Sequence, residues 1–213
     1  MIQGPYINDY DDQFAMGDGT TDKAFSVAFW MNRDNSTAAQ TIVGKYSDNS
    51  TLRCWEVGLD YPLNCQVGPQ IIYITLFDES NDGYIGVYGP SPTYSNWAFV
   101  VATYDGSGQT SGLKIYAHGV QINDTTYDSG TYVAMEPVGN PNAFFNLAQR
   151  EEGTNFFYGY LDSMMIWKGR ELNQNEVEQL TMEPFAMFRE TGLMLAPWSD
   201  SGRQSLIIQA LGL

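Results

Sequence analysis

Apolar and polar positions alternate along much of the chain, which is the pattern of half-buried β-strands. AFSVAFWM is a clear example, because Phe25, Val27, Phe29 and Met31 fall on one face of a strand. Strand-like segments recur at short intervals, with Gly, Asp and Asn between them: QTIVGKY, LRCWEVGL, QIIYITLF, GYIGVYG, NWAFVVATY, LKIYAHGVQI, NAFFNLAQ and FFYGYLDSMMIWKG. This spacing predicts an antiparallel β-sandwich or jelly roll.

One segment has the signals of a helix. Asn173 is a good N-cap and Glu176 follows three residues later, which is a capping-box arrangement. Val177 and Leu180 supply an apolar stripe, and Pro184 is expected to end the helix. We therefore predict a single short helix at about 173–182.

The remaining residues break the strand pattern and form a predicted C-terminal arm, so the chain divides into a domain at 1–183 and an arm at 184–213. The arm is too apolar to be left in water over one short segment. It must pack on its own sandwich, for example as an added edge strand, or on another subunit, and we expect the second. The residues predicted to mediate assembly are Phe185, Phe188, Trp198, Leu206 and Ile208.

Composition and charge narrow the classes of partner. The 213 residues include 10 basic and 25 acidic side chains, and the net charge of -15 argues against nucleic acid and anionic membranes as partners. The N-terminal MIQGPYINDYDDQF has no basic start and no apolar core, so we expect no secretory signal. Cys54 and Cys65 either bridge a local loop or stay reduced.

Four stretches, taken in order, resemble the concanavalin A-like jelly roll in its laminin G-like branch. They are FSVAFWM, NWAFVVATYDG, LKIYAHGVQI and GYLDSMMIWKGRELNQNEVEQL, and they cover roughly residues 10–182. The resemblance implies an all-β fold of two antiparallel sheets with one short C-terminal helix and an arm. EPFAMFR, after the helix, is similar to the sequence that follows such domains in tailed-phage structural proteins.

The same resemblance implies a structural calcium ion. Asp162 occupies the aspartate position of the family's last long strand, and in similar domains this residue binds Ca²⁺ together with the loop before the first core strand. Here that loop is MGDGTTDKAF, which offers Asp22 and Asp18 as further oxygen ligands. The alternative is that Asp162 only accepts hydrogen bonds from neighbouring amides.

Other polar motifs are better explained as turns than as active sites. DESNDG begins like a calcium loop, but no acid closes it, and Asn-Asp-Gly between two strands predicts a β-hairpin turn. The single histidine, His118, precedes Gly119 at a hairpin tip and has no evident orienting acid. Glu56 and Asp60 are the even-spaced acids of one strand, without the third acid that jelly-roll glucanases use. We therefore predict a protein that is not an enzyme.

Sugar binding without hydrolysis is compatible with the high aromatic content. The candidate glycan-binding residues are Trp55, Tyr61, Tyr73, Tyr88 and Tyr94, although an aromatic-rich sandwich buries most such side chains in its core. The sequence is compatible with two alternative functions. The first is a structural or adhesion protein of a virus-like particle, located in the virion, which contacts copies of itself, other virion proteins and surface glycans. The alternative is a stand-alone, extracellular lectin domain.

Overall fold

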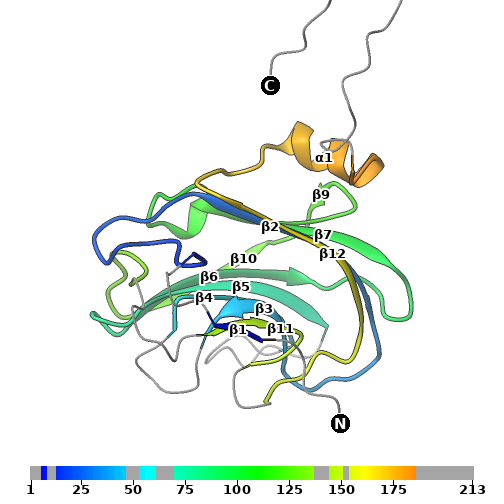
Figure 1. The fold of residues 1–213 in the computed structure, drawn as a ribbon, viewed down its shortest axis with the longest axis horizontal. Helices are drawn as coiled ribbons and strands as arrows, with labels where there is room; N and C mark the ends of the chain where they lie inside the picture. The colour runs from blue at the N-terminus through cyan, green and yellow to red at the C-terminus, as the bar shows by residue number, and fades with distance from the viewer. Residues whose placement is uncertain are drawn as a thin grey trace, which may run out of the picture.

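In a computed structural model, the described part of the protein is a sandwich of two antiparallel β-sheets with an α-helix on the outside (Figure 1). The structure describes residues 6–8, 13–46, 53–60, 70–136, 144–150 and 154–185. Its elements are β1 (Tyr6–Asn8), β2 (Phe25–Arg33), β3 (Gln40–Lys45), β4 (Trp55–Leu59), β5 (Ile71–Asp78), β6 (Gly83–Pro90), β7 (Ala98–Tyr104), η1 (Thr110–Gly112), β8 (Leu113–Ala117), β9 (Val120–Gln121), β10 (Thr125–Ser129), β11 (Phe144–Leu147), β12 (Gly159–Lys168) and α1 (Gln174–Met182).

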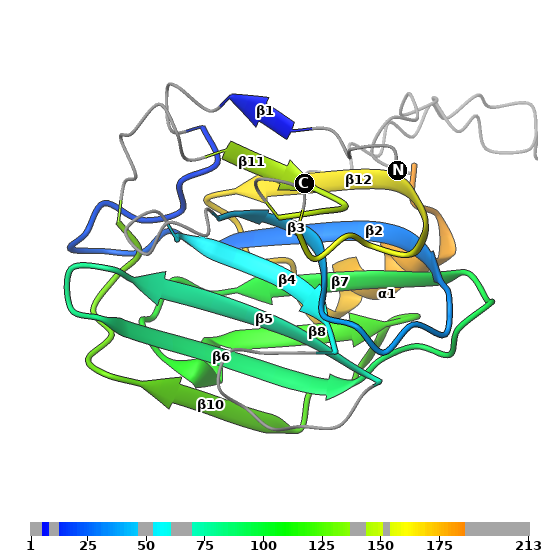
Figure 2. The same cartoon turned by 90° about the horizontal axis from the view of Figure 1, so that it is seen from below.

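The described strands form one sheet in the order β1-β11-β3-β4-β5-β6-β10 and a second in the order β12-β2-β7-β8-β9. Figure 2 shows the strands of the first sheet side by side, with the second sheet behind them. All the strand pairs are antiparallel, and the last long strand, β12, returns to pair with β2 near the start of the chain. This confirms the predicted two-sheet antiparallel jelly roll.

The main hydrophobic core lies between the two sheets. Phe25, Val27, Phe29 and Met31 of β2 belong to it and are at most 1% exposed, as the alternation predicted. Trp55 of β4 lies opposite them, and its ring centroid is 5.3 Å from that of Phe25. Removing large apolar side chains of this kind from water is the dominant favourable term in folding.

A second, smaller apolar cluster joins α1 to the outer face of the five-stranded sheet (Figure 1). Val177 and Leu180 of the helix pack against Ala28, Val101 and Tyr116 of the sheet. The Asn173 side chain accepts a hydrogen bond from the Glu176 amide, and the Glu176 side chain accepts one from the Asn173 amide. The predicted helix and its capping box are therefore confirmed.

The outer face of the seven-stranded sheet is also largely buried. Tyr73 and Tyr127 are 1% and 7% exposed. Their rings lie against Gly58 and Gly86, where an added Cβ would come within 2.5 Å of a ring atom. Each strand at the centre of this sheet is thus buried on both faces, and alternation alone cannot tell which of its faces is the core.

The turns predicted at two hairpins are present. DESNDG closes the β5–β6 hairpin, and the Asp78 carboxylate accepts hydrogen bonds from the Ser80 hydroxyl and the Asn81 amide. His118 has a φ of 50° and Gly119 a φ of 83° at the tip of the β8–β9 hairpin, a backbone conformation that a tight turn requires. No helix in the described part of the chain is long and apolar enough to cross a membrane.

The helix cap gives a first test of the packing. Asn173→Ala removes the side-chain acceptor of the capping box and is expected to lower the free energy of unfolding by about 1 kcal/mol, measured by urea denaturation. The matched control is Met182→Ala in the last turn, where the side chain is 82% exposed and the expected change is within about 0.5 kcal/mol. Equal losses for the two variants would contradict the capping role.

Candidate functional site

An exposed aromatic surface lies on the outer face of the five-stranded sheet, at the end that α1 leaves uncovered. Asn32 of β2 pairs with Tyr160 of β12 on one side. On the other side Met31 pairs with Ala98, the first residue of β7, so Trp97, which immediately precedes β7, lies beside Asn32. We call Tyr160 of β12, Asn32 of β2 and Trp97, which immediately precedes β7, the aromatic platform.

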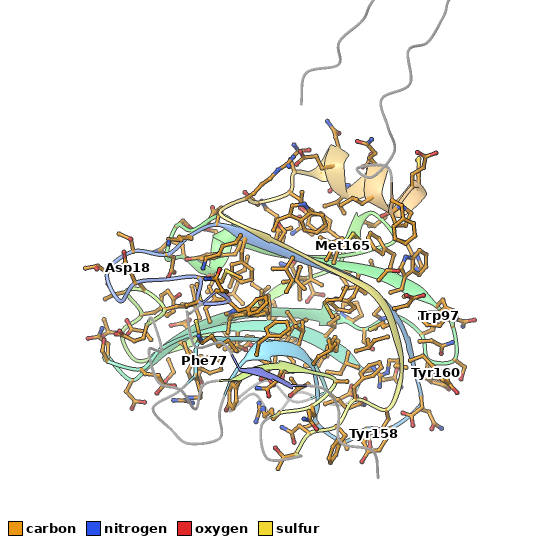
Figure 3. All side chains as sticks on the ribbon, in the orientation of Figure 1. Asp18, Phe77, Trp97, Tyr158, Tyr160 and Met165 are labelled. Carbon is orange, nitrogen blue, oxygen red and sulfur yellow. The ribbon has the colours of Figure 1, made fainter. Side chains whose placement is uncertain are left out.

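The two rings of the aromatic platform approach each other across β2. Trp97 is 45% exposed and Tyr160 is 71% exposed, yet their ring centroids are 6.5 Å apart with an interplanar angle of 41°. Figure 3 shows Trp97 and Tyr160 close together at one end of the sandwich, with Tyr158 further along. The half-buried Asn32 carries an amide between them, which offers both a hydrogen-bond donor and an acceptor.

A buried ion pair fixes the backbone beneath the platform. Arg33 follows Asn32, and its Nη2 lies 2.9 Å from Oδ2 of Asp60, with both side chains at most 2% exposed. The Arg33 guanidinium also donates to the Ser91 hydroxyl, and the Arg33 carbonyl accepts from the Ser95 amide at 2.8 Å. The loop that leads into Trp97 is therefore tied to β2 by side-chain and backbone bonds, which limits its freedom before any ligand arrives.

Next to the platform, β12 contains a β-bulge. The register shifts between Asp162, which pairs with Trp30, and Met165, which pairs with Ala28. Ser163 has a φ of 52° and donates its hydroxyl to Asp162 Oδ1 at 3.0 Å. Asp162, the aspartate in the apolar last strand, thus lies directly before an irregularity of the strand and is exposed.

The residues predicted to bind glycans do not form one surface. Trp55 is fully buried in the core, where its Nε1 donates to the Phe14 carbonyl at 2.8 Å, and Tyr73 is 1% exposed. Both predictions are wrong, because these rings are packed inside the protein. Tyr88 is half-buried with its ring 5.9 Å from that of Tyr127, and Tyr94 is 49% exposed in the loop before Trp97. Tyr61 lies outside the described residues.

The platform residues are not among those predicted from the sequence, although one signal was present. The alternation that places Phe29 and Met31 in the core also places Trp30 and Asn32 on the opposite face. What the sequence lacks is the pairing register that brings Trp97 and Tyr160 to the two sides of Asn32.

The predicted calcium ligands occupy separate places. Tyr104, which donates to Asp22 Oδ2 at 2.6 Å, pairs with Phe25 at the start of β2. Asp162 instead pairs with Trp30, five residues or about 16 Å further along the same strand. No group of three acidic, histidine or cysteine side chains among the described residues could hold a metal ion. Calcium binding by Asp22 and Asp162 stays a prediction, and this geometry does not support it.

Both loop carboxylates make hydrogen bonds to the protein. Asp22 accepts from the Tyr132 hydroxyl at 2.7 Å and the Met135 amide at 2.8 Å, in addition to Tyr104. Burial raises the pKa of Asp22 above its ordinary value, against the effect of these hydrogen bonds. Asp18 is exposed, and hydrogen bonds from the Thr21 and Thr20 amides lower its pKa to about 2. Each residue therefore has a structural role as a hydrogen-bond acceptor in its loop.

Glu56 is held in a buried network on the outer face of the seven-stranded sheet. Arg150 Nε and Nη2 each donate to the carboxylate at 2.8 Å, and the Tyr73 hydroxyl donates at 3.1 Å. The Thr41 hydroxyl is a further donor at 2.5 Å, and Glu56 has no exposed surface. Attraction to Glu56 raises the pKa of Arg150 despite its burial. Such a bidentate charged pair favours structural fixation over proton transfer.

The predicted assembly residues fall mainly outside the described chain. Phe185 is 56% exposed, whereas Phe188, Trp198, Leu206 and Ile208 lie outside the described residues, so the arm stays a prediction. Cys54 is buried in the core and Cys65 also lies outside the described residues, which leaves their pairing untested.

The comparisons with known proteins agree with this architecture. The family model of the concanavalin A-like lectin/glucanases superfamily, Laminin_G_3, matches residues 8–178. A candidate carbohydrate-binding protein from Bacteroides ovatus is similar in structure, with a TM-score of 0.53 and 18% identity over 76% of this chain and 41% of its own. The CBM40 domain of the Ruminococcus gnavus IT-sialidase, bound to α2,6-sialyllactose, has a TM-score of 0.51 and 12% identity over 84% and 97%. No curated protein matches the chain.

Asp22 provides a test that separates a hydrogen-bonding role from metal binding. Asp22→Ala leaves two tyrosine hydroxyls and one backbone amide without their acceptor, so we expect the free energy of unfolding to fall by about 2–4 kcal/mol. The loss should be the same in EDTA and in millimolar calcium, measured by urea denaturation. A loss seen only with calcium would instead identify Asp22 as a metal ligand.

Glu56 allows a second test of the buried networks. Glu56→Gln leaves the Arg150 guanidinium, whose side chain is 12% exposed, without its counter-ion. We expect the free energy of unfolding to fall by about 3 kcal/mol. Glu171→Gln, which breaks the more exposed pair with Lys114, serves as the control and should cost less than about 1 kcal/mol. A stable Glu56→Gln protein that has lost a polysaccharide-hydrolysing activity would contradict the structural role.

Proposed function

Because the chain belongs to the concanavalin A-like lectin/glucanases superfamily, we propose that it is a non-enzymatic glycan-binding module and that the aromatic platform is its binding surface. The observation that carries this proposal is the pair of exposed rings, Trp97 and Tyr160, 6.5 Å apart over the amide of Asn32. The apolar C–H faces of a sugar ring stack on aromatic side chains, while its hydroxyl groups need polar partners nearby. A sheet surface that combines both groups is suited to such a ligand.

The exposure of the rings supports a binding role over a packing role. Among the described residues, most aromatic side chains are buried or half-buried, and Trp55, Phe25 and Tyr104 are examples of buried ones. A soluble domain gains nothing in stability from leaving a tryptophan 45% and a neighbouring tyrosine 71% exposed. Clustered exposed aromatics generally mark interaction sites. The buried Arg33–Asp60 pair holds the site in place, so binding requires little ordering of the backbone.

The acids around the platform favour binding without hydrolysis. Glycoside hydrolases place two carboxyl groups about 5–9.5 Å apart on either side of the scissile bond. The acids flanking the platform are Asp162, which pairs with Trp30, and Asp34, four residues further along the chain than Trp30. At about 3.3 Å per residue, their backbones are about 13 Å apart. Glu56, the other candidate acid, is buried in its ion pair with Arg150.

The similar structures support the class of ligand. The Ruminococcus gnavus domain has a carbohydrate bound, and the Bacteroides ovatus protein is described as a candidate carbohydrate binder. At 12% and 18% identity they share the fold with this chain, and the choice of sugar must come from its own residues. The virion role predicted from the sequence relied in part on the C-terminal arm at 184–213, most of which lies outside the described residues, and it stays a prediction.

The test is glycan binding by platform variants. The wild type is screened on an array of oligosaccharides, and the affinity for the strongest ligand is then measured by isothermal titration calorimetry. Trp97→Ala and Tyr160→Ala each remove a stacking surface, and we expect each to weaken binding at least tenfold, in line with the cost of truncating a central aromatic contact.

Val120→Ala is the matched control, because Val120 is 65% exposed and lies on β9, two strands beyond β7 in the same sheet. Its affinity should stay within about twofold of the wild type. All three variants should keep the wild-type melting temperature within a few degrees, which separates lost contacts from lost folding. If Trp97→Ala and Tyr160→Ala bind as well as the wild type, the platform is not the binding surface.

A further inference from the structure

Resting on the proposed function, we propose that the aromatic platform is selective for uncharged glycans and discriminates against sugars that carry a carboxylate, such as sialylated glycans. The inference comes from the charges around the platform and from the positions of the basic side chains elsewhere. It names the chemical class of the ligand, which neither the fold nor the aromatic rings determine.

Two exposed carboxylates flank the platform along the strand direction. Asp162 precedes the bulge of β12 and pairs with Trp30, two residues before Asn32. Asp34 lies two residues after Asn32, and its amide donates to the Tyr158 carbonyl at 2.9 Å, which continues the pairing of β2 with β12. At about 3.3 Å per residue, the backbones of Asp162 and Asp34 each lie about 7 Å along the strand direction from the row that contains Trp97 and Tyr160.

Among the described residues, no cation forms an ion pair with either carboxylate. Asp162 accepts a hydrogen bond from the Ser163 hydroxyl, and Asp34 accepts one from the Ser36 amide at 2.8 Å. Both donors are neutral and both aspartates are exposed, so the two negative charges act on whatever occupies the platform. The Arg33 guanidinium lies nearby, but it is buried and paired with Asp60.

The other described basic residues are also engaged away from the platform. Ion pairs join the following residues: Arg53 with Glu79, Lys114 with Glu171, Arg150 with Glu56, and Arg170 with Glu176. Lys168 donates to the Gln13 carbonyl, and Lys45 is fully buried. Lys23 is exposed but precedes β2, at the opposite end from Asn32. The described residues therefore offer no cation at the platform to bind a sugar carboxylate.

The expected discrimination follows from Coulomb's law. One carboxylate at about 7 Å weakens the binding of a monoanion about threefold in water, and more where the protein surface lowers the effective dielectric constant. Two such carboxylates give about fivefold to tenfold, before screening by salt. The net charge of -15 adds a long-range repulsion of the same sign. An uncharged glycan experiences neither effect.

The experiment compares matched pairs of ligands. An array carries neutral oligosaccharides, and beside each one the same oligosaccharide with a terminal sialic acid. Calorimetry on the strongest neutral ligand and its sialylated counterpart then gives the ratio of affinities in 50 mM and 500 mM NaCl. We expect the wild type to bind the neutral member at least fivefold more tightly in low salt, and the ratio to fall in high salt because screening weakens the repulsion.

A charge-neutral double variant locates the effect. Asp34→Asn with Asp162→Asn should leave the affinity for the neutral glycan within about twofold and should strengthen binding of the sialylated counterpart at least threefold. The matched control is Asp124→Asn with Asp128→Asn, which removes the same net charge from exposed residues at and before β10, in the other sheet. This control should leave the ratio between the two ligands unchanged.

The outcomes separate the selectivity from the proposed function. Tighter binding of the sialylated glycan, lost in Trp97→Ala, would overturn the selectivity and leave glycan binding at the platform standing. An equal gain in the two double variants would show that net charge, and not the flanking pair, discriminates, and would also overturn the inference. If no glycan on the array binds the wild type, the proposed function fails, and the selectivity fails with it.

Discussion

The pairing of β2 with β7 on one side and with β12 on the other is the constraint on which the rest of the structure depends. The inner face of β2 carries Phe25, Val27, Phe29 and Met31 into the core. Its outer face divides into two parts with different roles. Its middle, at Ala28 and Trp30, is covered by α1 through Val177 and Leu180, and the end near Arg33 is left for the aromatic platform. A shift of one residue in either pairing would exchange the two faces of β2 or separate Trp97 from Tyr160.

The β-bulge in β12 lies where the covered part of the outer face meets the uncovered part. After the register shift, Met165 and Trp167 contact the cluster beneath α1. Before the shift, Tyr160 and Asp162 remain exposed on the same sheet. Tyr160, Asp162, Met165 and Trp167 all lie on the outer face, because the bulge changes the outward positions from even to odd numbers. Only the positions after the bulge are covered by the cluster beneath α1. Asp162 thus lies in the uncovered first part of β12, where a charged side chain remains in contact with water.

The elements were largely predictable from the sequence, because strand periodicity and capping act over a few residues. The strands from β2 to β9, with β11 and β12, coincide with segments of alternating pattern, and the Asn173 cap begins α1. β1 and β10 were not predicted. β1 is three residues long, and β10 reads TTYDS, a polar edge segment whose one buried residue is Tyr127. Such strands form because they hydrogen-bond to the edge of a neighbouring strand, so their own sequence gives little indication of β-structure.

The site was less predictable, because it depends on which faces are covered. Trp55 and Tyr73 are plausible sugar-stacking residues by type, but β4 and β5 are buried on both faces. Likewise, Asp22 and Asp162 look like partners in the family pattern, whereas the register places them at different ends of β2. The residue type gives the chemistry of a position, and the alternation indicates which face of the strand the side chain is on. Which residues lie next to that position on the neighbouring strands is determined only by long-range strand pairing.

The distribution of charge links stability to binding in this protein. With 10 basic against 25 acidic side chains, each cation used in a buried pair, such as Arg33 with Asp60 or Arg150 with Glu56, is unavailable at the surface. Breaking a buried pair costs far more than breaking an exposed one, so these arginines are retained inside. The surface left over is acidic. A binding site on it cannot rely on attraction to anions, and its affinity must come from stacking on aromatic rings and from hydrogen bonds to groups such as the Asn32 amide.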